Sequence, residues 1–322
     1  MVIYFWGVRG SLATPLRTTE YQSKLKKILA KLPEKGLHGE DEINSFIKSL
    51  PSKLKNIVSG NTTSLSIQSK NNNTYIIDAG SGIRVLGERL MKAGAAAGKT
   101  EYNIFITHTH WDHICGLPFF KPLYIPGNII NFYSPFDDLH ERLRYQQEER
   151  FFPMPFDKLA STRNFFKLNV NDPIFFENGD LKVTAWPLKH PGTSYAYKFE
   201  SGNRSFIMAT DAEFTGESLE GINEARDNFF NNSDVLVIDT QYTLDESFQK
   251  FDWGHTSVTM AVNCASSWNV KNLILTHHEP SYHDEKIYKN LNLANQHKSI
   301  IKHEELNIFL ARENMKITLP EK

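Results

Sequence analysis

The stretch that decides the fold is residues 108–113, His-Thr-His-Trp-Asp-His, which directly follows the apolar run from Tyr102 to Thr107. Three imidazoles and a carboxylate within six positions suit a protein core poorly, because each imidazole would need a hydrogen-bond partner and a desolvated carboxylate is costly. The same groups are good ligands for a divalent metal. Because residues two apart point in different directions on a helix, the spacing predicts a tight loop after a strand, with side chains converging on one or two ions.

Three more candidate ligands stand in the same context, just past an apolar, β-rich run. They are His190, Asp211 and His277. A two-metal site needs more ligands than one loop supplies, and strand ends from across the fold can provide them. Taken alone, Asp211 could cap a turn, and His277 with its neighbour His278 could lie on the surface. The repeated context favours metal binding.

The bulk composition is that of an ordinary soluble globular protein and excludes several classes. Of the 322 residues, 40% are hydrophobic and 23% charged, enough for one large domain or two ordinary ones. With 36 basic and 37 acidic residues, the chain has no net field to attract nucleic acid or an anionic membrane. No apolar run approaches the ~20 residues of a membrane span, and the N-terminus has no basic lead. We therefore expect a cytoplasmic protein without membrane contact, and nucleic acid is not an expected partner.

The two cysteines, Cys115 and Cys264, are too few for a disulfide scaffold and fit a reducing compartment. Cys115 lies just past the histidine-rich loop, so it is either a ligand or a buried free thiol, and we favour the thiol. Asp78, at the end of a predicted strand, is a candidate for holding the loop backbone or one of its imidazoles.

The pattern along the chain predicts one domain over residues 1–322, with two β-rich halves packed as two sheets and helices outside them. Residues 19–56 are polar and lysine-rich with apolar positions at helical spacing, and are predicted to form a two-helix insertion after the first strand, residues 2–6. The other expected strands are 64–68, 74–78, 102–107, 181–187, 194–200, 204–209, 234–239 and 273–276, and the other expected helices are 83–93, 137–150 and 256–268.

The chain resembles the metallo-β-lactamase fold superfamily, whose H-x-H-x-D-H motif stands here as His108, His110, Asp112 and His113. Further motifs resemble the branch that contains tRNase Z and the cyclic-nucleotide phosphodiesterases, and the opening resembles a bacterial subgroup of phosphodiesterase-like metal-dependent hydrolases. These motifs are residues 5–11, 60–64, 194–197, 210–211, 254–257 and 275–277. The resemblance implies an α/β fold, the four-layer αββα sandwich, in agreement with the two predicted sheets.

The resemblance also implies two divalent metal ions. The ligands would be His108, His110 and His190 for the first ion, Asp112, His113 and His277 for the second, and Asp211 as a bridge. Zinc is the expected metal, with manganese or iron as alternatives. The redox di-iron proteins of this fold use a glutamate at the position of His110, so the ligand set of this chain favours a hydrolytic dizinc site. Two such ions can share a hydroxide that serves as the nucleophile.

A leaving alkoxide needs a proton, and His255 is the candidate general acid. It is not needed as a ligand, and it matches the catalytic histidine of the tRNase Z branch. The alternative is that His255 caps a helix beside Thr256. Asp252, three residues earlier, could orient the imidazole. Asp112 and His255 are thus the expected catalytic residues.

Asn61, Ser64 and His255 are the expected substrate-binding residues, and Arg9 lies on a loop that could meet a phosphate. The leading hypothesis is a dinuclear-metal phosphodiesterase acting on a small nucleotide such as a cyclic one, because a poor sugar leaving group gains most from a general acid. The alternatives are an acyl-ester or lactone hydrolase of the same fold, a tRNA 3′-processing endonuclease, and a metal-bound sensor without turnover. The balanced charge counts against tRNA. A homodimer is expected by analogy with the branch.

Overall fold

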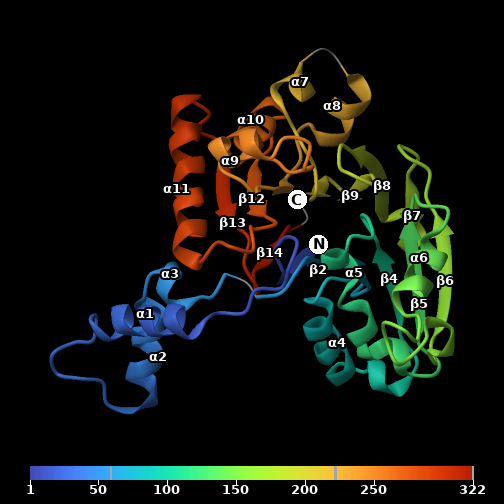
Figure 1. Cartoon of the computed structure of the whole chain (residues 1–322), viewed down its shortest axis with the longest axis horizontal. Coiled ribbons are helices and arrows are strands. Elements are labelled where there is room, and N and C mark those ends of the chain that lie inside the picture. Colours follow the sequence, from blue (N-terminus) through green and yellow to red (C-terminus); the bar gives the residue numbers. More distant parts are fainter. Residues whose placement is uncertain (59, 221–222, 321–322) are drawn as a thin grey trace.

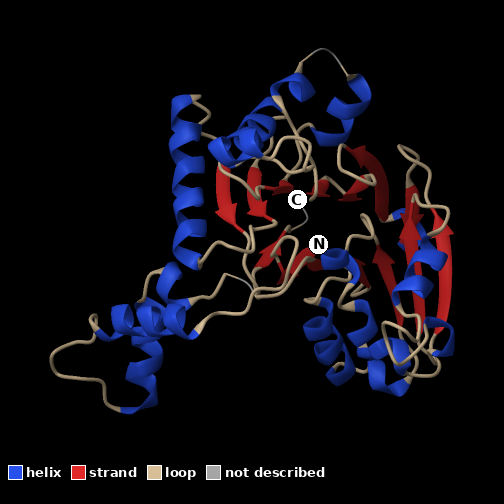
Figure 2. Cartoon of the chain, in the orientation of Figure 1, coloured by secondary structure: helices blue, strands red, loops and turns tan. Residues whose placement is uncertain are grey.

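The computed structural model describes residues 1–58, 60–220 and 223–320, and its centre is a pair of seven-stranded sheets packed face to face (Figures 1 and 2). The strands of the first sheet, in spatial order, are β14 (Lys316–Thr318), β1 (Val2–Gly7), β2 (Ser64–Gln68), β3 (Thr74–Ile77), β4 (Glu101–Phe105), β5 (Ile129–Ser134) and β6 (Thr162–Lys167). Those of the second sheet are β13 (Asn307–Leu310), β12 (Asn272–Thr276), β11 (Val235–Asp239), β10 (Arg204–Ala209), β9 (Ser194–Ser201), β8 (Leu181–Leu188) and β7 (Ile174–Phe176).

Helices cover the outer faces of both sheets, which gives the predicted four-layer αββα sandwich. The helices are α1 (Thr18–Leu29), α2 (Gly39–Ser49), α3 (Ser52–Lys55), α4 (Ile83–Lys92), α5 (Trp111–Ile114), α6 (Leu139–Gln146), α7 (Gly216–Leu219), α8 (Glu224–Phe230), α9 (Leu244–Gln249), α10 (Val258–Ser267) and α11 (Asp284–Ile300). The second sheet is covered by α10 and α11, and the first by α4 (Figure 1). Among the described residues, no helix combines the length and the apolarity needed to cross a bilayer.

Neighbouring residues of β4 show how the layers are held together. Ile104 packs outward into the cluster beneath α4, whereas Phe105 packs inward between the sheets, and both are fully buried. The Phe105 ring lies 4.9 Å from the ring of Tyr133 and 5.2 Å from that of Phe199, which belongs to the opposite sheet. A strand covered on both faces reads as a continuous apolar run, as this one does.

The strand directions bring several carboxyl ends to one edge of the second sheet. The strands β10, β11 and β12 are parallel, and β8 runs the same way because β9 is antiparallel to both β8 and β10. The end of β4 meets this edge from the first sheet. There the Tyr197 hydroxyl donates to the Ile106 carbonyl at 2.7 Å, and the Tyr195 amide donates to the Thr107 carbonyl at 3.1 Å. Loops that follow these strands must therefore converge.

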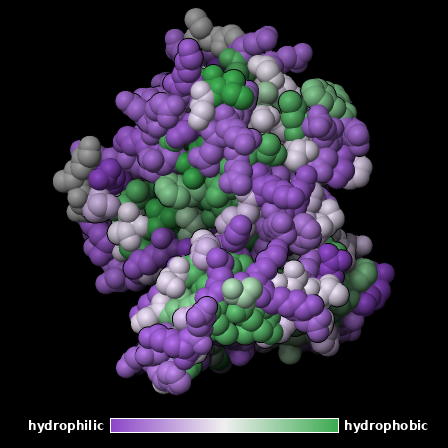
Figure 3. Space-filling view, turned by 90° about the vertical axis from the view of Figure 1, so that its left-hand side faces the viewer, coloured by the Kyte–Doolittle hydropathy of each residue, from purple (hydrophilic) through white to green (hydrophobic). Residues whose placement is uncertain are grey.

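The segment between β1 and β2 forms a helical arm, α1 to α3, that projects from the body of the molecule (Figure 1). Two helices were predicted over residues 19–56, and the structure adds the short α3. No residue of α1 or α2 is buried, and Leu29 and Ile47 are 52% and 46% exposed. Figure 3 views the molecule from the side on which the arm lies, and it shows exposed apolar residues in green in the lower part of the molecule, where the arm lies.

The substitution Phe105→Ala should lower the free energy of unfolding by about 3–5 kcal/mol, because it removes a ring from the packed layer between the sheets. Phe175→Ala is the matched control, since that ring on β7 is 62% exposed and should change stability by no more than about 0.5 kcal/mol. Urea unfolding followed by circular dichroism measures both. Equal losses for the two variants would contradict this account of the core.

Candidate metal centre

All seven residues predicted to hold metal lie in the loops and the short helix at the converging strand ends. His108 and His110 are in the loop after β4, and Asp112 and His113 follow in α5. The other three come directly after strands of the second sheet: His190 after β8, Asp211 after β10 and His277 after β12.

The seven side chains form two adjoining groups. The first group is His108, His110 and His190, and the second group is Asp112, His113, Asp211 and His277. Within each group, one ligand atom from every residue lies within 4.8 Å of the others. These two groups match the two sets that the resemblance implies, and two further groups include His255: one with His190 and Asp211, the other with Asp239 and His277.

Asp211 lies between the two groups and faces each with a different oxygen. Its Oδ1 is 3.7 Å from His108 Nε2 and 3.8 Å from His190 Nε2. Its Oδ2 is 3.0 Å from His113 Nε2 and 3.2 Å from His277 Nε2. A carboxylate placed in this way has the geometry of a bridge between two ions.

Three of the strands that end at the site are followed, within two residues, by a residue in the left-handed backbone region. These residues are Asp78, Asp211 and His277, with φ of 59°, 53° and 60°. The left-handed region is uncommon for side chains other than glycine, and Asn, Asp and His are the types that tolerate it best. Such strain persists where the surroundings demand it, and here it turns each side chain from its strand into the site.

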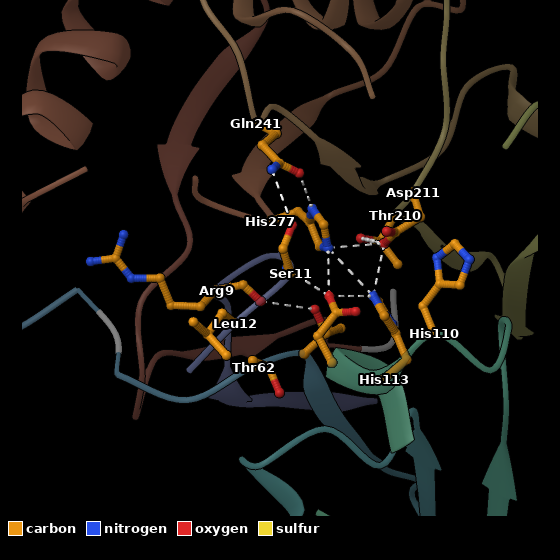
Figure 4. A network of polar contacts seen from close by, with 12 residues as sticks. Arg9, Ser11, Leu12, Thr62, His110, His113, Thr210, Asp211, Gln241 and His277 are labelled. Atoms are coloured by element: carbon orange, nitrogen blue, oxygen red, sulfur yellow. Dashed lines mark hydrogen bonds and ion pairs between the residues drawn. The ribbon is translucent and has the colours of Figure 1, made fainter. Parts of the chain in front are cut away.

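A second set of hydrogen bonds orients the side chains of the second group (Figure 4). Asp78 does both tasks considered for it, since it accepts from the His113 ring at 2.8 Å and from the Thr107 amide at 2.8 Å. The Ser11 amide donates to Asp112 Oδ2 at 2.7 Å. The Gln241 Oε1 lies 3.0 Å from His277 Nδ1. Contacts of this kind set the ring orientation and the tautomer of a ligating histidine.

His190 is held by the backbone of another loop. Its Nδ1 donates to the Gly254 carbonyl at 2.8 Å, which leaves Nε2 facing the cluster. Gly254 has φ of 82°, and a Cβ there would lie 2.2 Å from the same Nδ1. Only glycine fits a backbone that approaches the ring so closely.

The electrostatics of the two groups differ. Burial lowers the pKa of His108, His110 and His190, so the first group presents neutral imidazoles. In the second group burial is outweighed by neighbours of opposite charge. The His113 imidazole holds the pKa of Asp211 well below its ordinary value, and Asp211 raises the pKa of His277 to about 9. The carboxylates therefore stay ionised and stabilise positive charge on the imidazoles between them, a charge that a bound divalent cation would also supply.

The residues present fit a divalent metal. His108 Nε2 is buried and has no hydrogen-bond partner among the described residues. His113 Nε2 and His277 Nε2 lie 3.4 Å apart, and each is 3.0–3.2 Å from one oxygen of Asp112 and one oxygen of Asp211, so four possible ligand atoms converge. Buried polar atoms are almost always satisfied, so an unpartnered imidazole nitrogen aimed into a cluster of carboxylates is the mark of a ligand atom.

His255 lies beside the first group with its own carboxylate partner. Its Nδ1 is 2.6 Å from Asp239 Oδ2, and its ring packs 5.2 Å from the ring of His190. The suggestion that Asp252 orients His255 is wrong, because Asp252 pairs with Lys189 at 3.1 Å instead. Asp239 was missed, although the sequence carries a signal for it: it ends a predicted apolar strand, as Asp211 nearly does.

Burial speaks against Ser64 as a substrate-binding residue, because Ser64 is fully buried in β2. Asn61 is partly exposed, and its amide accepts from Ser81 and donates to Glu313, so substrate binding by Asn61 stays a prediction. Arg9 is buried, as Ser64 is, and donates to the carbonyls of Glu279 and Tyr282, so it braces the loop after β12 rather than meeting a phosphate.

Cys115 fits the thiol interpretation and is not a ligand. Its Sγ lies 3.6 Å from the Thr62 hydroxyl and in neither metal-binding group. Burial raises the pKa of this thiol, so a thiolate is disfavoured.

Taken together, the αββα fold and the convergent histidine and aspartate side chains define a metal-dependent hydrolase. A family model described as "Beta-lactamase superfamily domain" matches residues 73–278. The chain belongs to this family, in the metallo-β-lactamase fold superfamily that includes the tRNase Z-related branch.

Individual relatives are distant. A ribonuclease Z of Prochlorococcus marinus (strain MIT 9515) is 26% identical over 278 residues, 71% of this chain and 86% of its own. The fold is shared with the metallo-beta-lactamase fold protein YhfI from Bacillus subtilis, at a TM-score of 0.61 and 14% identity over 98% of both chains. It is also shared with the short form of human tRNase Z, at a TM-score of 0.59 and 17% identity over 100% of both chains.

His278, next to His277, is not a surface imidazole. It is 3% exposed, and its Nε2 donates to the Ala311 carbonyl at 3.0 Å. Burial lowers the pKa of this imidazole to about 3, against about 6.5 in an unfolded chain. As the pH falls, the unfolded chain therefore takes up a proton on this imidazole before the folded protein does. His278 leaves the free energy of unfolding unchanged above about pH 6.5 and lowers it progressively as the pH falls toward 3.

His278→Gln should make the protein less sensitive to acid, because glutamine keeps the donor to Ala311 and does not titrate. We expect the variant to lose about 1 kcal/mol less stability than the wild type between pH 7.5 and 5.5, measured by urea unfolding of metal-free protein. His140→Gln, at an imidazole whose side chain is 49% exposed, is the control and should follow the wild type. An unchanged pH dependence in His278→Gln would refute the assignment.

Proposed function

We propose that this chain is a dinuclear-metal phosphodiesterase that cleaves a nucleotide phosphodiester. The observation that carries the proposal is the position of Asp211, which presents one oxygen to each of two groups of ligand atoms. Two divalent ions bound there would supply a nucleophile at neutral pH and would offset charge on the phosphoryl oxygens. Zinc suits an imidazole and carboxylate donor set best, and manganese or iron are the alternatives.

The residues of the chain would divide the work. The two groups hold the ions, and Asp78, Gln241 and the Gly254 carbonyl keep the ligand rings in the orientation that binding requires. The Asp239 carboxylate accepts the Nδ1 proton of His255, which leaves Nε2 to protonate the departing oxygen. His255 keeps 9% of its side chain exposed, so it can both contact a substrate and stay oriented.

This pairing supports a phosphodiester over an acyl substrate. An oriented imidazole is most useful where the leaving group is a sugar alkoxide, which is a strong base and needs a proton as the bond breaks. A thioester needs no such donor, because its thiolate leaves as a stable anion. A sensor without turnover would not need an oriented proton donor beside a complete ligand set.

The proposal has two forms that differ in the size of the substrate, a small nucleotide or a tRNA precursor. The balanced charge of 36 basic and 37 acidic residues favours a small nucleotide, a cyclic one included. The relatives named ribonuclease Z favour cleavage of a tRNA precursor. Hydrolysis of cyclic mononucleotides, bis-p-nitrophenyl phosphate and a tRNA precursor by metal-loaded protein tests both forms. Absence of turnover on all three would refute the proposed function.

A homodimer stays a prediction, and the arm offers a surface for it. Leu25 and Leu29 of α1 and Ile43 and Ile47 of α2 are exposed, whereas Lys24 and Lys27 of α1 already pair with Asp284 and Glu285 of the same chain. The arms of two copies would cover these apolar side chains if they packed against each other.

Asp211→Ala should remove at least one of two bound ions and abolish turnover, because one carboxylate serves both groups. Metal content is measured by inductively coupled plasma mass spectrometry on dialysed protein. The control is Asp137→Ala, at a carboxylate whose side chain is 80% exposed, which should keep both ions. Full metal content and activity in Asp211→Ala would refute the bridging role.

His255→Ala should retain both ions and lower kcat by about 10²–10⁴ on a substrate with a sugar leaving group. The loss should be small on p-nitrophenyl esters, because p-nitrophenolate leaves without a proton. Asp239→Asn should show the same contrast more weakly, since it disturbs the tautomer of His255. Equal losses on both leaving groups would assign His255 to substrate binding, and loss of metal would make it a ligand.

A further inference from the structure

Three large aromatic side chains stand exposed on the segment that leads from α9 to the loop of His255. Phe248, Phe251 and Trp253 are 74%, 62% and 60% exposed. Six residues that expose three such rings form an uncommon surface, because aromatic side chains are normally at least half buried. The metal-binding groups and the His255–Asp239 pair do not use them.

This segment is fastened to the metal centre rather than free to move. Its last residue, Trp253, precedes Gly254, whose carbonyl accepts from His190. Lys189, which precedes His190, pairs with Asp252 at 3.1 Å and with Glu213 at 3.2 Å. The exposed rings therefore stand at the rim of the ligand cluster, held by the same backbone that positions one of its histidines.

Trp253 also connects to the side of the site that carries His255. The ammonium of Lys250 lies 5.6 Å from the Trp253 ring centre and 4.2 Å from that of Tyr242. Tyr242 in turn meets the His255 ring edge-on at 5.7 Å. The rim therefore presents an exposed indole and a half-buried cation, side by side, next to the expected proton donor.

We propose that Trp253 and Lys250 form a subsite for the nucleoside part of the substrate, with a planar base stacked on the indole and the ammonium near the phosphate. This rests on the proposed function and adds the side chains that would recognise the base and the phosphate of that nucleotide. Lys250 has only a distant carboxylate partner, Glu279 at 4.0 Å, so it can interact with an anion. An indole and an ammonium match the ring and the charge of a nucleotide.

The test uses two esters with the same scissile bond and the same leaving group, methyl p-nitrophenyl phosphate and thymidine 5′-p-nitrophenyl phosphate. Trp253→Ala should raise KM for the thymidine ester about tenfold or more, with little change for the methyl ester or in kcat. Trp253→Phe should restore most of the loss. Phe175→Ala, at an equally exposed ring on the edge strand β7, is the control and should change neither ester.

Lys250→Ala should raise KM for both esters alike, because both carry the phosphate, and Lys250→Arg should restore it. An equal effect of Trp253→Ala on the two esters would overturn the subsite. So would a change of oligomeric state in that variant without a change in KM, since the ring would then be a subunit contact.

Binding separates failure of the subsite from failure of the proposed function. Thymidine 5′-monophosphate should bind metal-loaded protein more tightly than ribose 5-phosphate by calorimetry, and Trp253→Ala should remove the difference. If neither ester is hydrolysed but this difference is present, the subsite stands and the proposed function fails. If the esters are hydrolysed and the difference is absent, the subsite fails alone. A tRNA precursor that loses affinity in Trp253→Ala while the monophosphate does not would also overturn it.

Discussion

The Asp211 carboxylate is the constraint on which the rest of the site depends. One small buried side chain faces His108 and His190 with one oxygen and His113 and His277 with the other. Imidazoles from three separate segments can be neighbours only if an ionised group between them offsets the cost of burying them together. The buried carboxylate does so at the end of β10, in a left-handed backbone conformation that no regular strand would allow.

Around this carboxylate the chain uses its backbone and its hydrogen bonds to fix the orientation of each ring. Asp78, Gln241 and the Gly254 carbonyl each hold one imidazole by the nitrogen that faces away from the cluster. The supports come from three loops, so a change in any of them alters a ligand without touching it. The same loops carry the groups that would meet a substrate, since Gly254 stands between Trp253 and His255.

From the sequence, most of the central strands of the two sheets were predicted, whereas none of the four edge strands was. The strands buried on both faces, such as β4 and β10, read as continuous apolar runs and were predicted within a residue or two. The strands β6, β7, β13 and β14 were missed, because each lies at an edge and mixes polar with apolar residues. The strand β5 was missed too, although it lies inside the first sheet and is largely buried. The long helix α11 was missed for a related reason, since its apolar residues follow no clear stripe. Short edge elements take their structure from pairing, which local sequence does not record.

By itself the sequence indicated seven candidate metal ligands, because the H-x-H-x-D-H motif places three imidazoles and a carboxylate in one loop and three more such residues follow apolar strands. It could not determine the partner of His255, since Asp252 is the carboxylate near it along the chain, whereas the folded structure places Asp239, at the end of β11, 2.6 Å from the ring. It also could not exclude Ser64, whose burial follows from the position of β2 inside the sheet. Residue chemistry is local and can be read along the chain, whereas distance and burial arise only when segments far apart in the sequence are packed together.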